Sequence, residues 1–215
     1  RQAVTAIDYG IVSRSPITLI TGELGSGKTL LLRNLMTKLR RDVTLVLISN
    51  ASGGPAEVLR WVMSAIDRPA TKGESHIELI TRFQKFLISE YAANRRVLLA
   101  VDEAQHLERQ TLETLRLMTN INADKHELIQ LLLIGQPELR QRVFSPDMLQ
   151  FAQRISAGCH LGAMSPKDTA GYVRHRLAVA GACDEIFSEA ALARVHELSG
   201  GIPRLINQLC DMALV

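Results

Sequence analysis

The chain has 215 residues, of which 47% are hydrophobic, and its 25 basic and 22 acidic residues give a formal charge of +3. This hydrophobic content is enough to bury a substantial core and excludes a disordered chain. So small a positive surplus neither requires nor excludes a nucleic-acid partner. The length predicts one large domain, or one domain with a small appendage.

The predicted strands and helices alternate along most of the chain. The strands are short apolar or β-branched runs, and the helices show apolar residues at helical spacing. In chain order they are a strand at Ile17–Thr21, a helix at Lys28–Leu39, a strand at Val43–Ile48, helices at Pro55–Ile66 and His76–Tyr91, a strand at Val97–Val101, a helix at Glu108–Met118, a strand at Leu128–Ile134, a short helix from Pro137 and a weaker strand at Ile155–Leu161.

Strands that alternate with helices predict a parallel sheet covered on both faces, with ligands bound at the carboxyl ends of the strands. The strand signals stop after Leu161, and three helices follow at Pro166–Ala178, Ser188–Leu198 and Pro203–Leu214. We therefore expect an α/β domain at residues 1–163 and a small helical domain at 164–215, truncated at its end.

The apolar runs are strand-sized, and none approaches the roughly 18 residues that a membrane span needs. No signal peptide is visible. The chain begins at Arg1 rather than Met and stops at Val215 within a helical pattern, so we expect a fragment of a longer protein. The three cysteines are widely spaced and form no C-x-x-C pair, which excludes a disulfide framework or a zinc site and favours a reducing compartment. We expect Cys159, Cys183 and Cys210 to be small buried apolar residues.

A glycine-rich segment between the first strand and the first helix matches G-x-x-x-x-G-K-[ST]. Its glycines let successive backbone N–H groups face phosphate oxygens, and the following helix adds the positive end of its dipole. Lys28 can reach the β- and γ-phosphates, and the Thr29 hydroxyl can ligate Mg²⁺. The sequence thus predicts an ATP site at Gly22, Glu23, Leu24, Gly25, Ser26, Gly27, Lys28, Thr29 and Leu30.

The strand at Val97–Val101 leads directly into an acidic pair, Asp102 and Glu103. Asp102 is expected to hold Mg²⁺ through water, and Glu103 to orient and deprotonate the attacking water. A switch that hydrolyses slowly does not need the second carboxylate, so its presence favours an ATPase. Gln105 and His106 follow, and we expect His106 to serve packing or a polar network.

Three further polar residues each allow two interpretations from the sequence alone. Gln136 follows the fourth strand, where its amide either contacts the γ-phosphate or the attacking water, or caps the helix that starts at Pro137. Arg154 and Arg204 either neutralise charge on the γ-phosphate in the transition state or are ordinary surface arginines.

Together these motifs resemble the AAA+ ATPases of the glutamate-using P-loop branch. The resemblance narrows to the ATPase domain of the general secretion pathway protein A type and to related pilus and exopolysaccharide assembly ATPases. It covers about Tyr9 to Val215 and rests on Gly22-Glu23-x-Gly-x-Gly-Lys-Thr, Asp102-Glu-Ala-Gln, Ile134-Gly-Gln-Pro-Glu-Leu139, His175-Arg-Leu-Ala-Val-Ala-Gly181 and Gly200-Gly-Ile-Pro-Arg-Leu-Ile-Asn207.

The resemblance implies a three-layer P-loop NTPase sandwich with a parallel five-stranded sheet, followed by an all-α lid. It places Gln136 at the sensor-1 position and Arg204 at the sensor-2 position on the lid, where it meets the nucleotide. Arg154 falls where these proteins place an arginine finger that acts on a neighbouring subunit's ATP.

For function, the resemblance implies an ATP- and Mg²⁺-dependent ATPase that forms a homo-oligomer, such as a ring, and works with a membrane or envelope partner. We expect a cytoplasmic location, at the inner face of the inner membrane where a segment outside this chain anchors it. Many relatives carry a membrane span and a peptidoglycan-binding domain, and neither is visible here.

Two rival functions share much of the same motif set. The first is an ATP-dependent DNA-binding regulator related to transposition target-selection or origin-binding ATPases, with phosphate contacts from Arg95, Arg96, Arg174, His175 and Arg176. Solvated surface charge is the plainer reading of those residues. The second rival is a nucleotide switch that recruits a partner without turnover.

Overall fold

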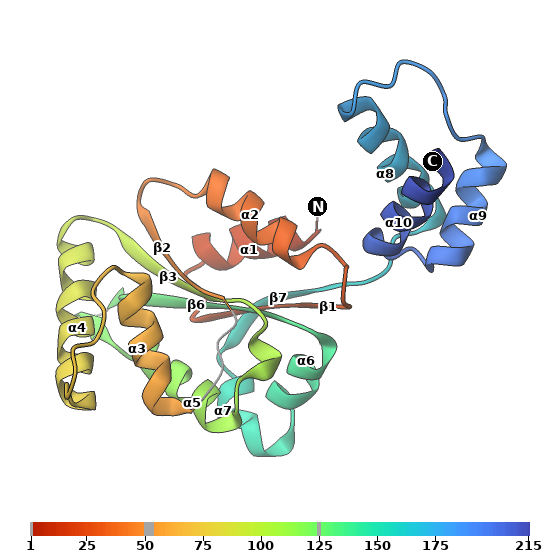
Figure 1. The fold of residues 1–215 in the computed structure, drawn as a ribbon. Coiled ribbons are helices and arrows are strands. Elements are labelled where there is room, and N and C mark those ends of the chain that lie inside the picture. The colour runs from red at the N-terminus through yellow and green to blue at the C-terminus, as the bar shows by residue number, and fades with distance from the viewer. Residues whose placement is uncertain (1, 50–53, 124–125) are drawn as a thin grey trace. The chain divides into compact units, whose positions relative to one another are not determined.

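The computed structural model describes residues 2–49, 54–123 and 126–215 (Figure 1). Its strands are β1 (Ile17–Gly22), β2 (Val43–Ile48), β3 (Arg96–Val101), β4 (Asn122–Ala123), β5 (His126–Glu127), β6 (Ile129–Gly135) and β7 (Ile155–Leu161). Its helices are α1 (Gln2–Val12), α2 (Lys28–Lys38), α3 (Pro55–Ala65), α4 (His76–Ala92), α5 (Arg109–Met118), α6 (Pro137–Val143), α7 (Leu149–Ala152), α8 (Pro166–Val179), α9 (Glu189–Ser199) and α10 (Pro203–Leu214), with single 3-10 turns η1 (Ala104–His106) and η2 (Pro146–Met148).

Five of the strands form one sheet in the order β2-β3-β6-β1-β7. The pairs β2–β3, β3–β6 and β6–β1 are parallel, with Val101 opposite Leu133 and Thr21 opposite Gly135. The predicted α/β fold with a five-stranded parallel sheet is therefore confirmed. A two-stranded antiparallel ribbon of β4 and β5, which the sequence analysis does not predict, lies outside this sheet.

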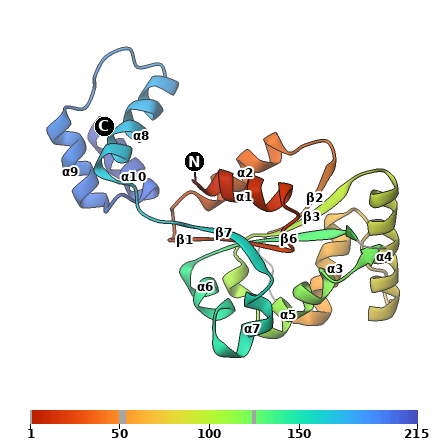
Figure 2. The ribbon, with the colours of Figure 1, turned by 180° about the vertical axis from the view of Figure 1, so that it is seen from behind.

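Helices cover both faces of the sheet, with α1 and α2 on one face and α3, α5 and α6 on the other (Figures 1 and 2). Every residue of β1 and β6 is buried, as is all of β3 after Arg96. Strands that are covered on both faces read as continuous apolar runs rather than alternating ones, which is why these segments could be recognised in the sequence.

Contacts within the chain form two compact units, one of Arg1–Gly22 with Lys28–His160 and one of Glu23–Gly27 with Leu161–Val215. The second unit packs α8, α9 and α10 around an apolar cluster of its own, which includes Val173, Leu192 and Ile206. The predicted domain boundary at 163–164 stays a prediction. None of the helices in the described part of the chain combines the length and apolar character that a bilayer crossing requires.

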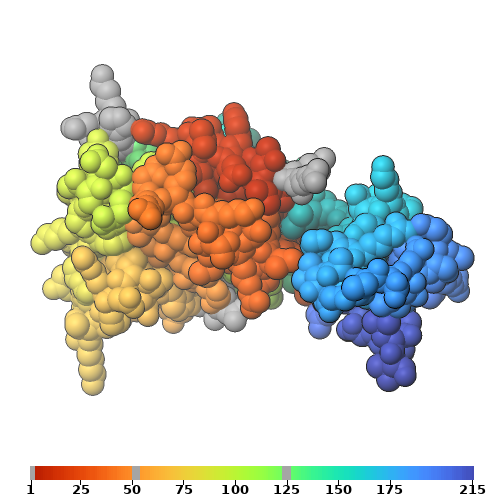
Figure 3. All heavy atoms as spheres, turned by 90° about the horizontal axis from the view of Figure 1, so that it is seen from above, coloured from red at the N-terminus to blue at the C-terminus, as the bar shows by residue number. Residues whose placement is uncertain are grey.

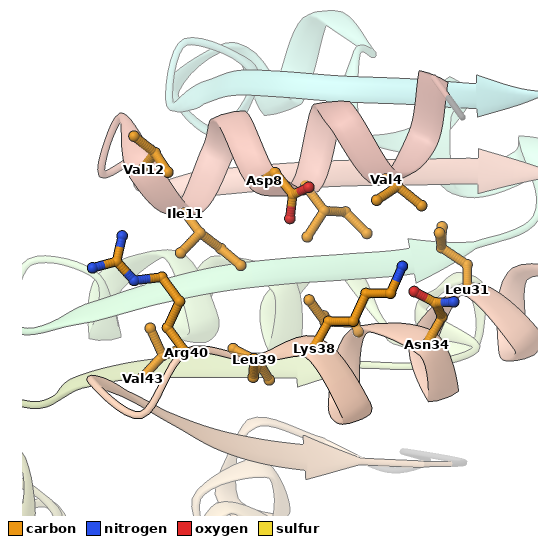
Figure 4. Close-up of a pocket in the computed structure, with 12 residues that line it drawn as sticks. Val4, Asp8, Ile11, Val12, Leu31, Asn34, Lys38, Leu39, Arg40 and Val43 are labelled. Carbon is orange, nitrogen blue, oxygen red and sulfur yellow. The ribbon is translucent and has the colours of Figure 1, made fainter.

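Helix α1 precedes the first predicted strand and is not among the predicted helices. Its buried residues Ala3, Ile7 and Ile11 recur at every fourth position, so one stripe of the helix faces the sheet. The atoms of α1 and α2, red and orange in Figure 3, form part of the surface on this side of the first unit. Between the two helices lies an apolar hollow of about 180 Å³, with the polar side chains of Asp8 and Lys38 among its walls (Figure 4).

The expectation that all three cysteines are buried is wrong for two of them. Cys210 is buried in the cluster of the second unit, whereas Cys159 is half-buried and Cys183 is exposed. Cys159 lies on β7 at the edge of the sheet, and Cys183 lies in the connection between α8 and α9. A sheet edge and a connecting segment both leave a residue partly open to solvent, so the small size of cysteine does not decide its burial.

Candidate functional site

Three neighbouring strands of the sheet end in the segments that the sequence singles out. The glycine-rich loop follows β1, Gln136 follows β6, and Asp102 with Glu103 follows β3. Because β3, β6 and β1 are adjacent and parallel, their carboxyl ends lie at the same edge of the sheet. The sheet order thus brings together residues that are up to about a hundred positions apart in the chain.

The glycine-rich loop leads from the last residue of β1 into the first residue of α2. Lys28 is only 5% exposed, and its Nζ donates a hydrogen bond to the carbonyl of Gly22, 2.8 Å away. The backbone N–H of Ser26 donates to the carbonyl of Glu23 at 3.1 Å, which curls the loop. Thr29 is exposed in the first turn of α2. This geometry is that of a loop able to surround an anion at a helix N-terminus.

Asp102 is 7% exposed at the end of β3, and its backbone N–H donates to the carbonyl of Ile48 on β2 at 2.9 Å. Burial raises the pKa of the Asp102 carboxyl above its usual range. The hydrogen bond from the backbone N–H of Glu103 to Asp102 Oδ1, at 2.9 Å, and the charge of Lys28 act in the opposite direction. A carboxylate that is costly to desolvate is stabilised by an added cation.

Glu103 has a left-handed backbone, with φ of 53°, directly before the turn η1. This conformation is uncommon for a residue with a side chain and is concentrated at functional sites. The Glu103 carboxylate accepts a hydrogen bond at Oε2 from Nε2 of Gln105 at 2.5 Å. The side chain is therefore held by a neighbour rather than free in solvent.

Gln136 occupies the N-cap position of α6, but its side chain makes no capping hydrogen bond. Its backbone N–H donates instead to Oε1 of Gln105 at 3.0 Å. The half-buried Gln136 side chain stays available for other contacts, and the capping interpretation of this residue loses its main support.

The two arginines of interest lie in different units. Arg154, after α7, is half-buried, and its Nη1 donates to Oγ1 of Thr119 at 3.3 Å. Arg204 is exposed in the first turn of α10, and its backbone N–H donates to the carbonyl of Gly25 at 3.3 Å within the second unit. A Cβ on Gly25 would lie 2.6 Å from the Cβ of Arg204, so the loop passes close to this turn of α10.

Sequence reasoning missed the part played by Gln105 and Arg142. Gln105 is 9% exposed and contacts both Glu103 and the backbone after β6, while Arg142 on α6 donates from Nη1 to the carbonyls of Gln105, at 3.0 Å, and Leu107. The only signal in the sequence is the position of Gln105 two residues after the acidic pair, which does not reveal that its side chain is buried.

Most of the basic residues assigned to the DNA-binding alternative are engaged within the chain. Arg95 makes two hydrogen bonds of 2.7 Å to the carboxylate of Glu90. Arg96 donates to Asp42 at 3.2 Å and to the carbonyl of Ile11 at 3.1 Å. The remaining two arginines pair inside the second unit, Arg174 with Glu189 and Arg176 with Tyr172 and Asn207. These contacts favour the interpretation that the arginines are structural surface charges over the interpretation that they bind DNA.

Residues 12–143 match the family model described as "AAA domain", which covers more than half of the chain. The chain belongs to the AAA domain family. The resemblance drawn from the motifs is likewise confirmed, because the chain is 41% identical over 214 residues to general secretion pathway protein A of Aeromonas hydrophila. The match takes in 100% of this chain but only 39% of that protein's length.

Solved structures similar to this AAA domain support the fold. Cdc6p from Pyrobaculum aerophilum superimposes with a TM-score of 0.75 at 17% identity, over 97% of this chain and 59% of the other. A Walker-type ATPase of Pyrococcus abyssi gives a TM-score of 0.67 at 16% identity, over 96% of this chain and 65% of the other. At such low identities these likenesses bear on the fold alone.

Proposed function

We propose that this AAA domain binds ATP with Mg²⁺ and hydrolyses the γ-phosphate. The observation that carries the proposal is the sheet order: β1, which leads into the glycine-rich loop, and β3, which ends before Asp102 and Glu103, run parallel in one sheet with only β6 between them. A phosphate loop alone provides nucleotide binding. A second carboxylate beside the first adds a group able to take a proton from water, which is what hydrolysis needs beyond binding.

Each residue has a distinct part in the proposed reaction. The backbone N–H groups from Gly22 to Leu30 and the ammonium of Lys28 hold the phosphates, and Lys28 neutralises charge that develops on the γ-phosphate. Glu103 orients a water for in-line attack and accepts its proton. Gln136, at the end of β6, contacts the γ-phosphate or that water through its amide.

The residues also fit a Mg²⁺ ion that arrives with the nucleotide. Asp102 offers a buried carboxylate whose pKa is raised by that burial, and Thr29 offers an exposed hydroxyl in the first turn of α2. Hard oxygen ligands of this kind suit Mg²⁺, which usually keeps several of its waters. When bound, the ion would neutralise charge on the β- and γ-phosphate oxygens.

We further propose that the ATPase works as a homo-oligomer, such as a ring, in which Arg154 completes the site of the neighbouring subunit and Arg204 contacts the nucleotide from the lid. Arg154 is half-buried, and its guanidinium donates a hydrogen bond to the neutral hydroxyl of Thr119 and forms no ion pair with the described residues. A guanidinium without a carboxylate partner remains able to act on a phosphate.

Mixing two defective variants tests this arrangement. Arg154→Ala keeps Glu103 but cannot supply the finger, while Glu103→Gln supplies the finger but cannot hydrolyse. Alone, Arg154→Ala should lose roughly 10³-fold in kcat, the lower end for an arginine finger. Mixed oligomers should recover activity, because a Glu103→Gln subunit then serves the site of an Arg154→Ala subunit.

The matched control is Arg140→Ala, which removes an exposed arginine of α6 and should leave kcat unchanged. No recovery on mixing, at protein concentrations where both variants assemble, would contradict action on the neighbour. A rate per wild-type subunit that stays constant from dilute to concentrated protein would contradict the dependence on assembly altogether.

For the biological role, we propose that ATP hydrolysis drives assembly of a bacterial secretion or pilus envelope complex at the cytoplasmic face of the inner membrane. The support is the 41% identity to general secretion pathway protein A. The test is a Glu103→Gln allele in the native host, which should block assembly of the envelope complex. Normal assembly with this allele would refute the role while leaving the ATPase proposal intact.

A further inference from the structure

We propose that Gln105 is the positioning residue for hydrolysis: its side chain holds the Glu103 carboxylate and ties it to the backbone at the end of β6. This inference rests on the proposed function, because it assumes that Glu103 activates water. It assigns to Gln105 no contact with the nucleotide, only the task of fixing where the base lies.

The amide of Gln105 uses both of its ends. Nε2 donates to Oε2 of Glu103 at 2.5 Å and also lies 3.1 Å from Nε2 of His106, while Oε1 accepts from the backbone N–H of Gln136 at 3.0 Å. A backbone N–H can only donate and a carboxylate can only accept, so the two partners together fix which end of the amide points where. A side chain with a single polar end, or with two like ends, cannot satisfy both.

The backbone of Gln105 is held as firmly as its side chain. Arg142, in the last turn of α6, donates from Nη1 to the carbonyl of Gln105 at 3.0 Å and to the carbonyl of Leu107. Helix α6 therefore contacts the turn η1 through both of its ends, at the N-cap backbone and at Arg142. The turn, the helix and the end of β6 form one connected structure that carries Glu103 with it.

The residue before Gln136 shows how closely this structure is packed. A Cβ on Gly135 would lie 2.8 Å from Oε1 of Gln105 and 3.3 Å from its backbone N. A larger residue at this position would force the amide of Gln105, and Cδ2 of Leu139 at 2.8 Å, to shift. Gly135 at the end of β6 and Gln105, two residues after Glu103, are thus matched in size for a direct contact.

The contact places a fixed donor beside a carboxylate with an uncommon left-handed backbone. A base that must reach a water in line with the γ-phosphate loses rate steeply when it moves. A displacement of about 1 Å can cost on the order of 100-fold in rate. The effect of losing Gln105 is therefore expected in the chemical step and not in nucleotide binding.

The test uses two substitutions in the full protein that separate the two hydrogen bonds. Gln105→Glu keeps an acceptor for the N–H of Gln136 but replaces the donor to Glu103 with a like charge. Gln105→Met has a side chain of nearly the same length and removes both bonds, together with the contact between Nε2 of Gln105 and Nε2 of His106. Each should lower kcat by about 10- to 100-fold, with the Kd for a fluorescent ATP analogue unchanged. In a Glu103→Gln background neither should lower kcat further, because the group that they position is already absent.

The matched control is Gln141→Glu, the same substitution at an exposed position of α6, which should leave kcat and Kd at wild-type values. A wild-type kcat in Gln105→Glu would overturn the inference and leave the proposed function standing. Absence of hydrolysis by the wild-type oligomer would defeat both. If Gln105→Glu fails to fold in a melting experiment, Gln105→Met decides. A full further loss of kcat in the Glu103→Gln background would show that Gln105 does not act through Glu103.

Discussion

Two adjacent glycines at the end of α9 have similar backbone conformations but different contacts, which allows a direct comparison. Gly200 and Gly201 both have a left-handed backbone, with φ of 56° and 73°. A Cβ on Gly200 would meet no atom within 4 Å, whereas a Cβ on Gly201 would lie 2.3 Å from the carbonyl oxygen of Met164 and 2.9 Å from its nitrogen. The N–H of Met164 also donates to the carbonyl of Gly201 at 2.9 Å.

The expected losses of stability follow from these contacts. Gly200→Ala should cost about 1–2 kcal/mol, the penalty for a side chain in the left-handed region. Gly201→Ala carries the same penalty, together with about 1–3 kcal/mol of overpacking and about 1 kcal/mol for a weakened hydrogen bond to Met164. The second substitution should therefore cost about 2–4 kcal/mol more than the first, enough to unfold a small helical unit.

The assay is amide hydrogen exchange of α8, α9 and α10 in the two variants and the wild type. Exchange reports the opening free energy of these helices separately from the sheet of the first unit. We expect a modest loss of protection in Gly200→Ala and a near-complete loss in Gly201→Ala. Equal protection in the two variants would refute the steric reasoning.

Three further predictions concern other parts of the chain. Arg95→Met should destabilise the fold at pH 7 in urea unfolding, because the mostly buried Glu90 loses a partner that donates two hydrogen bonds, although the exposure of Arg95 to solvent weakens the effect. Hydrogen bonding to Arg95 lowers the pKa of Glu90. The difference in unfolding free energy between wild type and variant should therefore be complete above the ordinary pKa of glutamate and vanish as the pH falls through the lowered pKa of Glu90. A stability difference independent of pH would contradict this prediction. A thiol reagent should modify Cys183 in the folded protein but Cys210, whose burial raises the pKa of its thiol, only after unfolding, and rapid reaction of both would count against the described burial. Gly135→Ala should lower kcat without weakening ATP binding, because the added Cβ displaces the amide of Gln105. A turnover assay and a binding titration check this, and weakened ATP binding with a normal kcat would contradict it.

The features that could be predicted are those encoded by short runs of sequence. The strands β1, β3 and β6 are continuous apolar runs because both of their faces are covered, and the glycine-rich loop is recognised from eight consecutive residues. The predicted bounds of these elements differ from the structure by at most one residue at either end, as with β6, which begins at Ile129 and ends at Gly135. Such differences are ordinary for the ends of elements.

What could not be predicted depends on contacts between distant segments. The amide of Gln105 is buried because the end of β6 lies beside the turn η1. The contact joins Gln105 to Gln136, which is 31 residues further along the chain, and no local sequence pattern encodes it. The exposure of Cys183 follows from its place in a connecting segment of the second unit. Helix α1 is a different case, because the spacing of Ala3, Ile7 and Ile11 is a helical signal that the sequence itself contains.

Single-turnover hydrolysis tests the central claim most directly. Excess assembled protein is mixed with ATP and Mg²⁺, and phosphate release is followed for the wild type and Glu103→Gln, with ATP binding measured alongside. We predict release by the wild type, and tight binding with release slowed at least about 100-fold in Glu103→Gln, the scale of a lost general base. Equal release by the two proteins, at equal binding, would contradict the assignment of Glu103 as the base.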